Sequence, residues 1–578
     1  MSAINTAAAS VSIDVSPNRV SLKPDATQQF AAKVVGASDT AVIWSVNGIR
    51  GGNPTVGAIS PGGLYTAPIE ASASIVQVEA SAAADLAVSG QAAVAVAAAG
   101  DHGPTYYVAI TGSDKNSGAD NAPWRTIQHA VDTVPAGATI LVRSGTYNEL
   151  VTVTRSGSAT AGFISLQAAT SATPIIDGTG LGIPNGQYGL VTIKDSSFVR
   201  IAGFVIQNYV SDSAENVPIG IYVVGSGSHI ELRHNHIQYI KTTVTTSSGD
   251  ALGIAVYGSE APAAISWLTI DSNQLDHLVT GFSESLSLSG NVTLWQVTNN
   301  AIHDNDNIGI NIEGFFATAP QSEYDQARNG LVADNTVYNI TSAKNPAYGD
   351  SRGADGIYID GGTNVTIQQN LVHDTDLGIE MASEVPGRAT SQVLAHDNVV
   401  YRSYVTGISI GGADSEQNGG TQDCVIANNT LYDNDTTQSG SGEFQIQYHA
   451  AGNVFYNNIV YANSQGLLVN GFAPGTAPAA LDHNLYDSTA GASASQWIWS
   501  GRTYTTFTAY KAGSHSDAHG KFSYPAFVDQ TTLDLKLTAS SPALGLGENL
   551  GELEIGVSDY GGGTRVVDSR VDAGAYEF

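Results

Sequence analysis

The chain has 578 residues, which is long for one domain and predicts two or more. Its formal net charge of -30 argues against nucleic acid and anionic membrane surfaces as partners, because both select basic proteins. The single cysteine, Cys424, excludes a disulfide framework and a cysteine zinc site within one chain, and its apolar sequence neighbours predict a buried core residue.

No segment is long and apolar enough to span a bilayer, so we expect no membrane insertion. The first residues, Met1-Ser-Ala-Ile-Asn, do not form a signal peptide. The architecture inferred below is typical of secreted or periplasmic bacterial proteins. We therefore expect that location, with the signal peptide absent from this sequence.

Residues 1–96 are assigned to a small β-sandwich, because alternating apolar runs from Val11 to Val96 are separated by turn residues. The phrases Ser-Pro-Asn-Arg-Val-Ser-Leu, Ile-Trp-Ser-Val-Asn-Gly and Gly-Leu-Tyr-Thr-Ala-Pro resemble bacterial immunoglobulin-like domains of the group-2 type. Trp44 is interpreted as a core residue of this unit. The Ala- and Gly-rich residues 97–104 are interpreted as a linker.

Residues 105–578 are assigned to one catalytic domain with a cap at each end. Its first part runs from Tyr-Tyr-Val-Ala-Ile-Thr-Gly-Ser-Asp through a short amphipathic helix, Pro123-Trp-Arg-Thr-Ile-Gln-His-Ala-Val-Asp. Together with Gly137-Ala-Thr-Ile-Leu-Val-Arg, these segments resemble the N-terminal cap of right-handed parallel β-helix enzymes of the pectate-lyase-like superfamily. The resemblance implies an all-β fold.

Two markers then recur in alternation, as expected of stacked coils. One is an Asn followed by two mostly apolar residues, as in Asn335-Thr-Val and Asn370-Leu-Val. These asparagines are expected to adopt the left-handed conformation at tight turns and to form ladders of side-chain amides. The other marker is a strand of the form Gly-Ile-x-Ile, whose apolar positions would fill a continuous core.

Three consecutive copies of the second marker carry carboxylates where earlier copies carry neutral residues: Gly309-Ile-Asn-Ile-Glu-Gly314, Gly356-Ile-Tyr-Ile-Asp-Gly361 and Gly378-Ile-Glu-Met-Ala-Ser-Glu384. Because strand side chains alternate between faces, the acids should share the outward face. Glu313 and Asp360 should be neighbours about 4.8 Å apart along the backbone, and Glu380 should lie roughly 8 Å from Asp360.

Such a cluster of carboxylates predicts raised pKa values and an active site that cleaves carbohydrate. Two other readings stay open. Outward acids can simply be solvated, and calcium, which takes six to eight oxygen ligands, is a candidate ion for this surface. No other cofactor is expected. The histidines near the Asn turns do not have metal-ligand spacing, so they are interpreted as turn or surface residues.

The three segments, and the ending Ser540-Ser-Pro-Ala-Leu-Gly-Leu-Gly through Asp572-Ala-Gly-Ala-Tyr-Glu, resemble the β-helix glycosidases around glycoside hydrolase family 120, the β-xylosidase family. The resemblance covers roughly residues 105–578. It implies retaining hydrolysis with an Asp nucleophile and a Glu acid/base.

On that resemblance, Asp360 is the nucleophile, Glu384 the first choice for the acid/base and Glu380 the second, while Glu313 tunes or orients the pair. Stacking alone offers a rival pair, since Glu313 and Asp360 are near the roughly 5 Å separation of a retaining pair. Residues assigned to substrate binding are Asn311, Tyr358 and Asp355.

The expected partner is an oligosaccharide or polysaccharide of plant or microbial origin, and an oligomer is compatible with the sequence. A polysaccharide lyase that acts on uronates, with calcium, is the first alternative, and a non-enzymatic carbohydrate-binding surface protein the second. An epimerase is a weaker option. Lyases need a basic residue, and the nearby Arg352 and Arg388 are expected to pair with the surplus acids instead.

Overall fold

A computed structural model of the protein describes residues 11–69, 75–96, 103–345, 347–349, 351–473 and 478–578. The chain divides into two compact units. One comprises Met1–Gly100 with Asn549–Val557, and the other comprises Asp101–Glu548 with Ser558–Phe578. Each unit is described by itself.

The first unit is built from short, mostly antiparallel sheets. Its largest sheet has five strands in the order β2, β11, β10, β5 and β6 (Arg19–Leu22, Asp85–Val96, Ile75–Ala82, Val42–Val46 and Ile49–Arg50). A second sheet has the order β3, β9, β8 and β7 (Thr27–Gln29, Leu64–Thr66, Gly57–Ile59 and Gly52–Asn53), and β1 pairs with β4 (Ser12–Ser16 and Ala31–Val35). Trp44 is buried in the core of this unit, as predicted.

The boundaries of this unit differ in one respect from those expected from the sequence. The segment Asn549–Val557, which contains helix α3 (Glu552–Ile555), groups with the first unit, although the sequence analysis placed all of residues 105–578 in the catalytic domain. Most of the expected linker, residues 97–102, lies outside the described residues. The likeness of this unit to immunoglobulin-like domains stays a prediction.

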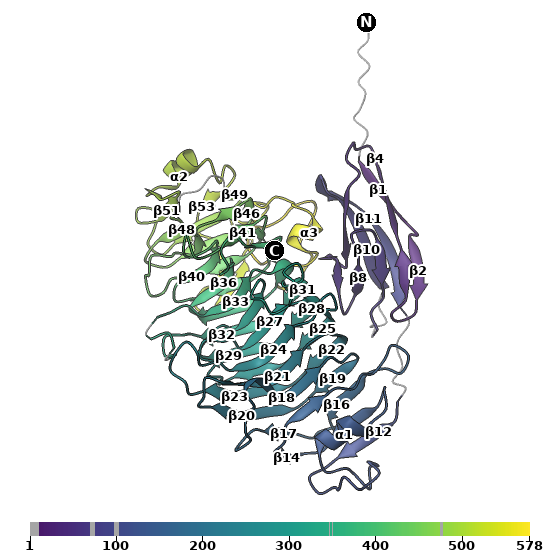
Figure 1. The fold of residues 1–578 in the computed structure, drawn as a ribbon. Coiled ribbons are helices and arrows are strands. Elements are labelled where there is room, and N and C mark those ends of the chain that lie inside the picture. Colours follow the sequence, from purple (N-terminus) through teal and green to yellow (C-terminus); the bar gives the residue numbers. More distant parts are fainter. Residues whose placement is uncertain (1–10, 70–74, 97–102, 346, 350, 474–477) are drawn as a thin grey trace. The chain divides into compact units, whose positions relative to one another are not determined.

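The second unit is a parallel β-helix made of three long sheets, and the stack of coils is visible in Figure 1. Its first sheet follows the order β12, β13, β16, β19, β22, β25, β28, β31, β34, β38, β42, β46 and β49 (Thr105–Val108, Thr139–Val142, Ile164–Ala168, Val199–Ala202, Gly227–Arg233, Ile265–Asp271, Val292–Thr298, Arg328–Ala333, Thr363–Gln368, Leu394–His396, Val425–Ala427, Asn453–Tyr456 and Ala479–Asp482). A side branch of this sheet contains β37, β41 and β45 (Ala389–Ser391, Gly420–Gln422 and Ala450–Ala451).

The second sheet contains β14, β17, β20, β23, β26, β29, β32, β35, β39, β43, β47, β50 and β53 (Gly145–Tyr147, Pro174–Asp177, Val205–Ser211, His236–Thr242, Gln274–Asp276, Ala301–Asn305, Thr336–Ile340, Leu371–Thr375, Val399–Tyr401, Thr430–Tyr432, Ile459–Ala462, Leu485–Ser488 and Lys521–Phe522). The third contains β15, β18, β21, β24, β27, β30, β33, β36, β40, β44, β48, β51 and β52 (Val151–Val153, Gly186–Lys194, Asn216–Val224, Leu252–Gly258, Leu286–Gly290, Ile310–Glu313, Asp355–Asp360, Leu377–Ala382, Thr406–Ile410, Phe444–Ile446, Leu467–Gly471, Gln496–Trp499 and Arg502–Tyr504). We call this third sheet the site sheet.

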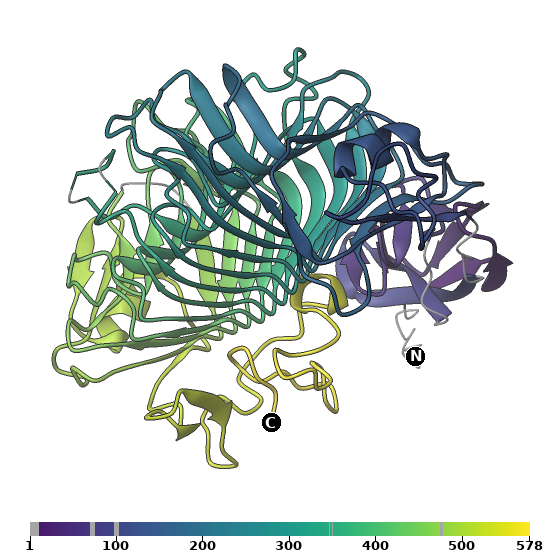
Figure 2. The same cartoon turned by 90° about the horizontal axis from the view of Figure 1, so that it is seen from below.

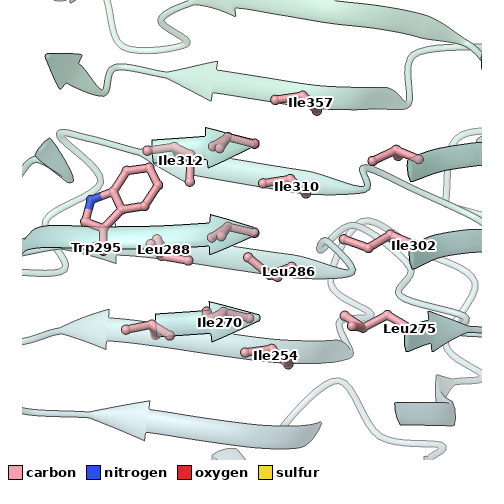
Figure 3. Close-up of a cluster of buried hydrophobic side chains, with 14 of the residues drawn as sticks. Ile254, Ile270, Leu275, Leu286, Leu288, Trp295, Ile302, Ile310, Ile312 and Ile357 are labelled. Atoms are coloured by element: carbon pink, nitrogen blue, oxygen red, sulfur yellow. The ribbon is translucent and has the colours of Figure 1, made fainter. Parts of the chain in front are cut away.

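The core of the β-helix is a set of apolar columns that run from coil to coil. On the site sheet, Ile310 lies beside Ile357, which lies beside Ile379. Figure 3 shows such columns, with Ile254, Leu286 and Ile310 above one another on successive coils. Cys424 is fully buried in the same core, as predicted.

A ladder of side-chain amides accompanies this core at one corner of each coil. Each ladder asparagine donates through its backbone N–H and its Nδ2 to the Oδ1 of the asparagine on the next coil, at 2.9–3.2 Å, through the series Asn235, Asn273, Asn300, Asn335, Asn370, Asn398, Asn429, Asn458 and Asn484. The amide ladder was predicted correctly.

The predicted conformation of these asparagines was wrong by one position. The residue with positive φ is the one before each ladder asparagine, for example Asp334 at 57° and Gln369 at 54°. The ladder asparagine itself is needed for its side chain, which supplies both a donor and an acceptor along the stack.

Each end of the β-helix carries a helix. Near the start, α1 (Ile127–Thr133) begins after Thr126, whose side chain accepts from the N–H of His129, and it buries Ile127, Ala130 and Val131. Near the end, α2 (Phe507–Ser514) packs Tyr510 against Trp497 of β51, with ring centroids 5.6 Å apart. A final hairpin pairs β54 with β55 (Phe527–Asp529 and Asp534–Leu537). Figure 2 shows the coils from below. Among the described residues, no helix has the length and apolar character needed to cross a membrane.

Candidate active site

Three neighbouring strands of the site sheet bring the predicted acids together. Glu313 at the end of β30 pairs in register with Asp360 at the end of β33, and Tyr358 pairs with Glu380 of β36. Asn311 lies beside Tyr358 on the preceding coil. The stacking predicted from the Gly-Ile-x-Ile pattern is therefore confirmed as an arrangement of backbones, and the acids share one stretch of the sheet.

Beside these strands lies a cavity of about 250 Å³, which we call the acid cavity. Four predicted site residues line it: Asp355, Tyr358, Glu380 and Glu384. The rest of its wall is formed by Phe282, Ile308, Tyr348, Gly353, Ala382, Ser383, Gly412, Ala413 and Asn418. No lysine or arginine is part of this wall.

Asp360 is connected to this cavity through Glu384. The Asp360 side chain is buried, with 2% of the residue exposed, and its Oδ1 accepts a hydrogen bond from the backbone N–H of Glu384 at 2.8 Å. Glu384 itself lies two residues after the end of β36, in the wall of the acid cavity, and part of its surface is open to solvent. The short turn after β36 therefore fixes the position of one acid relative to the other.

Glu313 has different partners. Its Oε1 accepts from Ser287 Oγ at 2.6 Å and from Asn311 Nδ2 at 3.1 Å. Asn311 is buried, and its own Oδ1 has no hydrogen-bond partner. Glu313 and Asn311 therefore form a polar pair on β30, beside Asp360 and outside the wall of the acid cavity.

Crowding and burial raise the pKa values of these acids. Burial raises the pKa of Asp360 well above its usual range, and the neighbouring charges of Glu384, Glu313 and Glu380 raise it further, whereas the hydrogen bond from the Glu384 N–H lowers it. Burial raises the pKa of Glu380 to about 7. Burial also raises the pKa values of Glu384 and Glu313.

The surplus negative charge has no cationic partner within the described part of the chain, where no salt bridge includes any of these acids. The expectation that Arg352 and Arg388 pair with them was wrong. Arg352 pairs with Asp376 at 2.8 Å. The guanidinium of Arg388 stacks on Phe315, 4.8 Å from the ring centroid.

Three residues at the site were missed by the sequence analysis. Glu284 precedes β27, and burial together with the charge of Glu313 raises its pKa well above the usual range. Phe282 and Tyr348 stack at 4.8 Å between ring centroids and form an aromatic wall of the acid cavity. All three lie just outside the repeated strands, so only the position of Glu284 directly before Ser285-Leu-Ser-Leu could have indicated it.

A bound cation would need several oxygen atoms close together. In the described part of the chain, the one group of three potential ligands with atoms within 4.8 Å of one another is Asp482, His483 and His519, on the last coils. The acids of the cavity do not form such a group as they stand. Calcium binding at the acid cavity stays a prediction.

Comparisons with known proteins agree with this fold. A family described as "Pel9A-like, right handed beta helix region" matches residues 106–282, which end before the acidic strands. The uncharacterized protein YwoF of Bacillus subtilis (strain 168) is 36% identical over 442 residues, which cover 76% of this chain and 92% of YwoF. Pectate lyase PEL9 of Emericella nidulans is 31% identical over 163 residues, which cover 27% of this chain and 40% of PEL9.

Two solved structures are similar at low sequence identity. Pectate lyase Pel9A has a TM-score of 0.44 at 15% identity and covers 82% of this chain and 96% of its own. XylC, solved in complex with xylose, has a TM-score of 0.45 at 11% identity and covers 82% of this chain and 98% of its own. The fold is a right-handed parallel β-helix.

Proposed function

We propose that the chain, which belongs to the family of the uncharacterized protein YwoF of Bacillus subtilis, is a retaining glycoside hydrolase with β-xylosidase-like action. In this proposal Asp360 is the nucleophile and Glu384 the acid/base. The observation that carries the proposal is the contact between them: the Glu384 N–H donates to the Asp360 carboxylate at 2.8 Å, at the edge of a cavity walled by acids and aromatic rings.

The two acids differ in a way that suits them to two roles. Asp360 has a backbone donor that stabilises its anion, whereas no such donor acts on the pKa of Glu384, which burial raises. In this proposal the Glu384 N–H helps to stabilise the anion of the nucleophile Asp360, and the Glu384 side chain, which lines the acid cavity, donates the proton. A pair of carboxyl groups with separated pKa values is what a glycosidase needs near neutral pH.

The reaction takes place in two steps. An oxygen of the Asp360 carboxylate attacks the anomeric carbon while the glycosidic C–O bond breaks, and the proton of Glu384 goes to the leaving oxygen. The Glu384 carboxylate then takes a proton from water, whose oxygen attacks the anomeric carbon and displaces Asp360. The net change is hydrolysis, with the anomeric configuration retained.

The cavity also suits a sugar as ligand. Phe282 and Tyr348 supply an aromatic wall, and Asp355 is buried with an Oδ1 that has no hydrogen-bond partner. An unpaired buried acceptor is costly, and a sugar hydroxyl can satisfy it. A surface protein without catalytic function would have no need for several acids in one cavity with raised pKa values.

A second candidate is a polysaccharide lyase that acts on uronates. It is supported by the match of residues 106–282 to a Pel9A-like family and by the similarity to pectate lyase PEL9. Against it, β-elimination needs a base and a group that neutralises the uronate carboxylate. The wall of the acid cavity offers no lysine or arginine, so a lyase here would require a cation such as calcium.

The experiment compares wild type with Asp360→Asn on xylo-oligosaccharides and on a polyuronate mixture, with calcium and with EDTA. Released reducing sugar and the ultraviolet absorbance of unsaturated ends are recorded together. The hydrolase predicts sugar release without absorbance, insensitive to EDTA and lost in the variant. Absorbance that requires calcium would contradict it and favour the lyase.

A further inference from the structure

A second hollow lies next to the acid cavity. It has a volume of about 430 Å³, and its wall includes Asn418, which also lines the acid cavity. Its floor includes Ala389 and Ser391 of β37 and Gly420 and Gln422 of β41, the side branch of the first sheet. The two cavities therefore share one wall residue, which places them close enough for a ligand longer than one sugar unit to reach both.

One wall of this second hollow is made of Arg388 and Phe315. The guanidinium of Arg388 lies over the Phe315 ring, 4.8 Å from its centroid. In the described part of the chain its side chain has no ion pair, although the protein has 53 acidic and only 23 basic residues and Glu384 is four residues away. A guanidinium that stacks on a ring keeps the N–H donors at its edge available for a planar acid.

Phe315 is held in place by its own loop. Its backbone N–H donates to the carbonyl of Asp325 at 2.7 Å, and the buried Asp325 carboxylate accepts from the N–H groups of Ala317 at 2.6 Å and Ala319 at 2.8 Å. The adjoining Gln326 donates through Nε2 to the carbonyl of Gly361, next to Asp360, at 2.7 Å. The loop that carries Phe315 is thus fixed to the end of the strand that carries the proposed nucleophile.

We propose that Arg388 and Phe315 form a second sugar subsite, which binds the carboxylate of a uronic acid unit adjacent to the bond cleaved in the acid cavity. Arg388 binds the carboxylate through its guanidinium edge, and Gln326, Gln422 and His449 face the sugar hydroxyls from the same hollow. The substrate class is then an acidic oligosaccharide, with a neutral sugar at the acids and a charged one at Arg388. The inference rests on the proposed function, since it takes the acid cavity as the place of cleavage.

The separation of charges supports this order of sugars. Asp360, which is ionised when it attacks, repels a uronate in the first cavity, whereas the arginine in the second hollow attracts one. Carboxylate recognition by arginine is a charge-assisted contact of two parallel hydrogen bonds when the geometry allows it. A uronic acid therefore gains more than a neutral sugar of the same shape at Arg388.

The test measures binding rather than turnover, so that its failure is distinguishable from failure of the hydrolase proposal. Methyl β-D-glucuronide and methyl β-D-glucoside, which differ only at C6, are titrated by ligand-observed NMR into the Asp360→Asn protein, with and without Arg388→Gln. The glucuronide is expected to bind about tenfold more tightly than the glucoside, and Arg388→Gln to abolish that difference.

Arg502→Gln is the matched control, since Arg502 is an exposed arginine stacked on Tyr504 at 5.1 Å and lies on β52 rather than at the hollow. This control should leave the tenfold preference intact, and unchanged melting temperatures should show that the variants are folded. Equal affinity for the two glycosides, no binding of either, or a preference that survives Arg388→Gln would each overturn the proposal.

Discussion

The carboxylate of Asp360 accepts a hydrogen bond from the backbone N–H of Glu384, at 2.8 Å across two neighbouring coils. This contact links the end of β33 to the turn after β36, so the positions of the two acids depend on each other. It also lowers the pKa of Asp360 against the opposing effects of burial and of the Glu384 charge. This backbone donor thus partly offsets the burial and the neighbouring charges that raise the pKa of Asp360.

The choice between the two candidate acid/base residues can be tested by comparing substrates whose leaving groups differ in their need for a proton. Glu384→Gln should lower kcat on an unactivated oligosaccharide by about 10²–10⁴-fold, because the leaving oxygen then receives no proton. With a nitrophenyl glycoside the loss should be much smaller, since that group leaves unprotonated. Glu380→Gln should cost less than about tenfold on either substrate. The reverse pattern would assign the acid/base role to Glu380.

The pH dependence of kcat/KM should report the crowding of the acids. Asp360 must be ionised to attack, and its raised pKa places the acidic limb of the profile above that of an ordinary carboxyl group. The charge of Glu380 contributes to that raised pKa, so Glu380→Gln should move the acidic limb to lower pH. A limb that stays in place would show that Asp360 and Glu380 do not interact.

Glu380 should also make stability depend on pH. Burial raises its pKa from 4.5 to about 7, so between these values the unfolded chain ionises and the folded protein does not. The contribution of Glu380 to the free energy of unfolding is therefore fully present below about pH 4 and is lost as the pH rises through 7. Glu380→Gln, which imitates the protonated acid, should therefore stabilise the protein by about 1–3 kcal/mol at pH 8 and have no effect at pH 4.

Denaturant unfolding at the two pH values measures this difference. Glu416→Gln, at an exposed loop residue, serves as the control and should have no effect at either pH. A stabilisation by Glu380→Gln that is equal at pH 4 and pH 8 would rule out the titration of Glu380 as its cause.

The amide ladder should be a main source of local stability. Asn370 is fully buried, and its Nδ2 donates to the carbonyl of Val332 and to Oδ1 of Asn398, both at 3.0 Å. Asn370→Ala leaves buried backbone groups without partners and should destabilise the protein by about 2–4 kcal/mol. Asn116→Ala, at an exposed asparagine whose Nδ2 donates to the carbonyl of Pro123 at 2.9 Å, should cost less than about 1 kcal/mol in the same denaturant titration.

The repeated part of the site could be predicted from sequence because stacking converts equal positions in the repeat into neighbours in space. Glu313, Asp360 and Glu380 follow directly from the Gly-Ile-x-Ile register. The side chains supplied by loops could not be placed in this way. Phe282, Tyr348 and Phe315 lie in connections whose lengths vary between coils, and the hydrogen bonds of Asp325 that position Phe315 have no counterpart in the repeat.

The ion-pair partners of charged residues could not be predicted from the sequence either. Arg352 is near the acids in the chain, but Asp376 is fully buried and already accepts from the Ser342 N–H, so the arginine completes that buried site. Arg388 lies four residues after Glu384 and is held over an aromatic ring instead. Proximity along the chain therefore gives no guide to ion pairs where loops leave the coil.

Trapping a covalent intermediate tests directly whether Asp360 is the nucleophile. Wild-type protein is incubated with 2-deoxy-2-fluoro glycosides bearing an activated leaving group, with the sugar released in the activity assay, and is then analysed by intact and peptide mass spectrometry. We expect one added fluorosugar on the peptide that contains Asp360, and none in Asp360→Asn. A fluorosugar found on Glu313, or an unmodified protein that nonetheless cleaves the parent substrate, would contradict it.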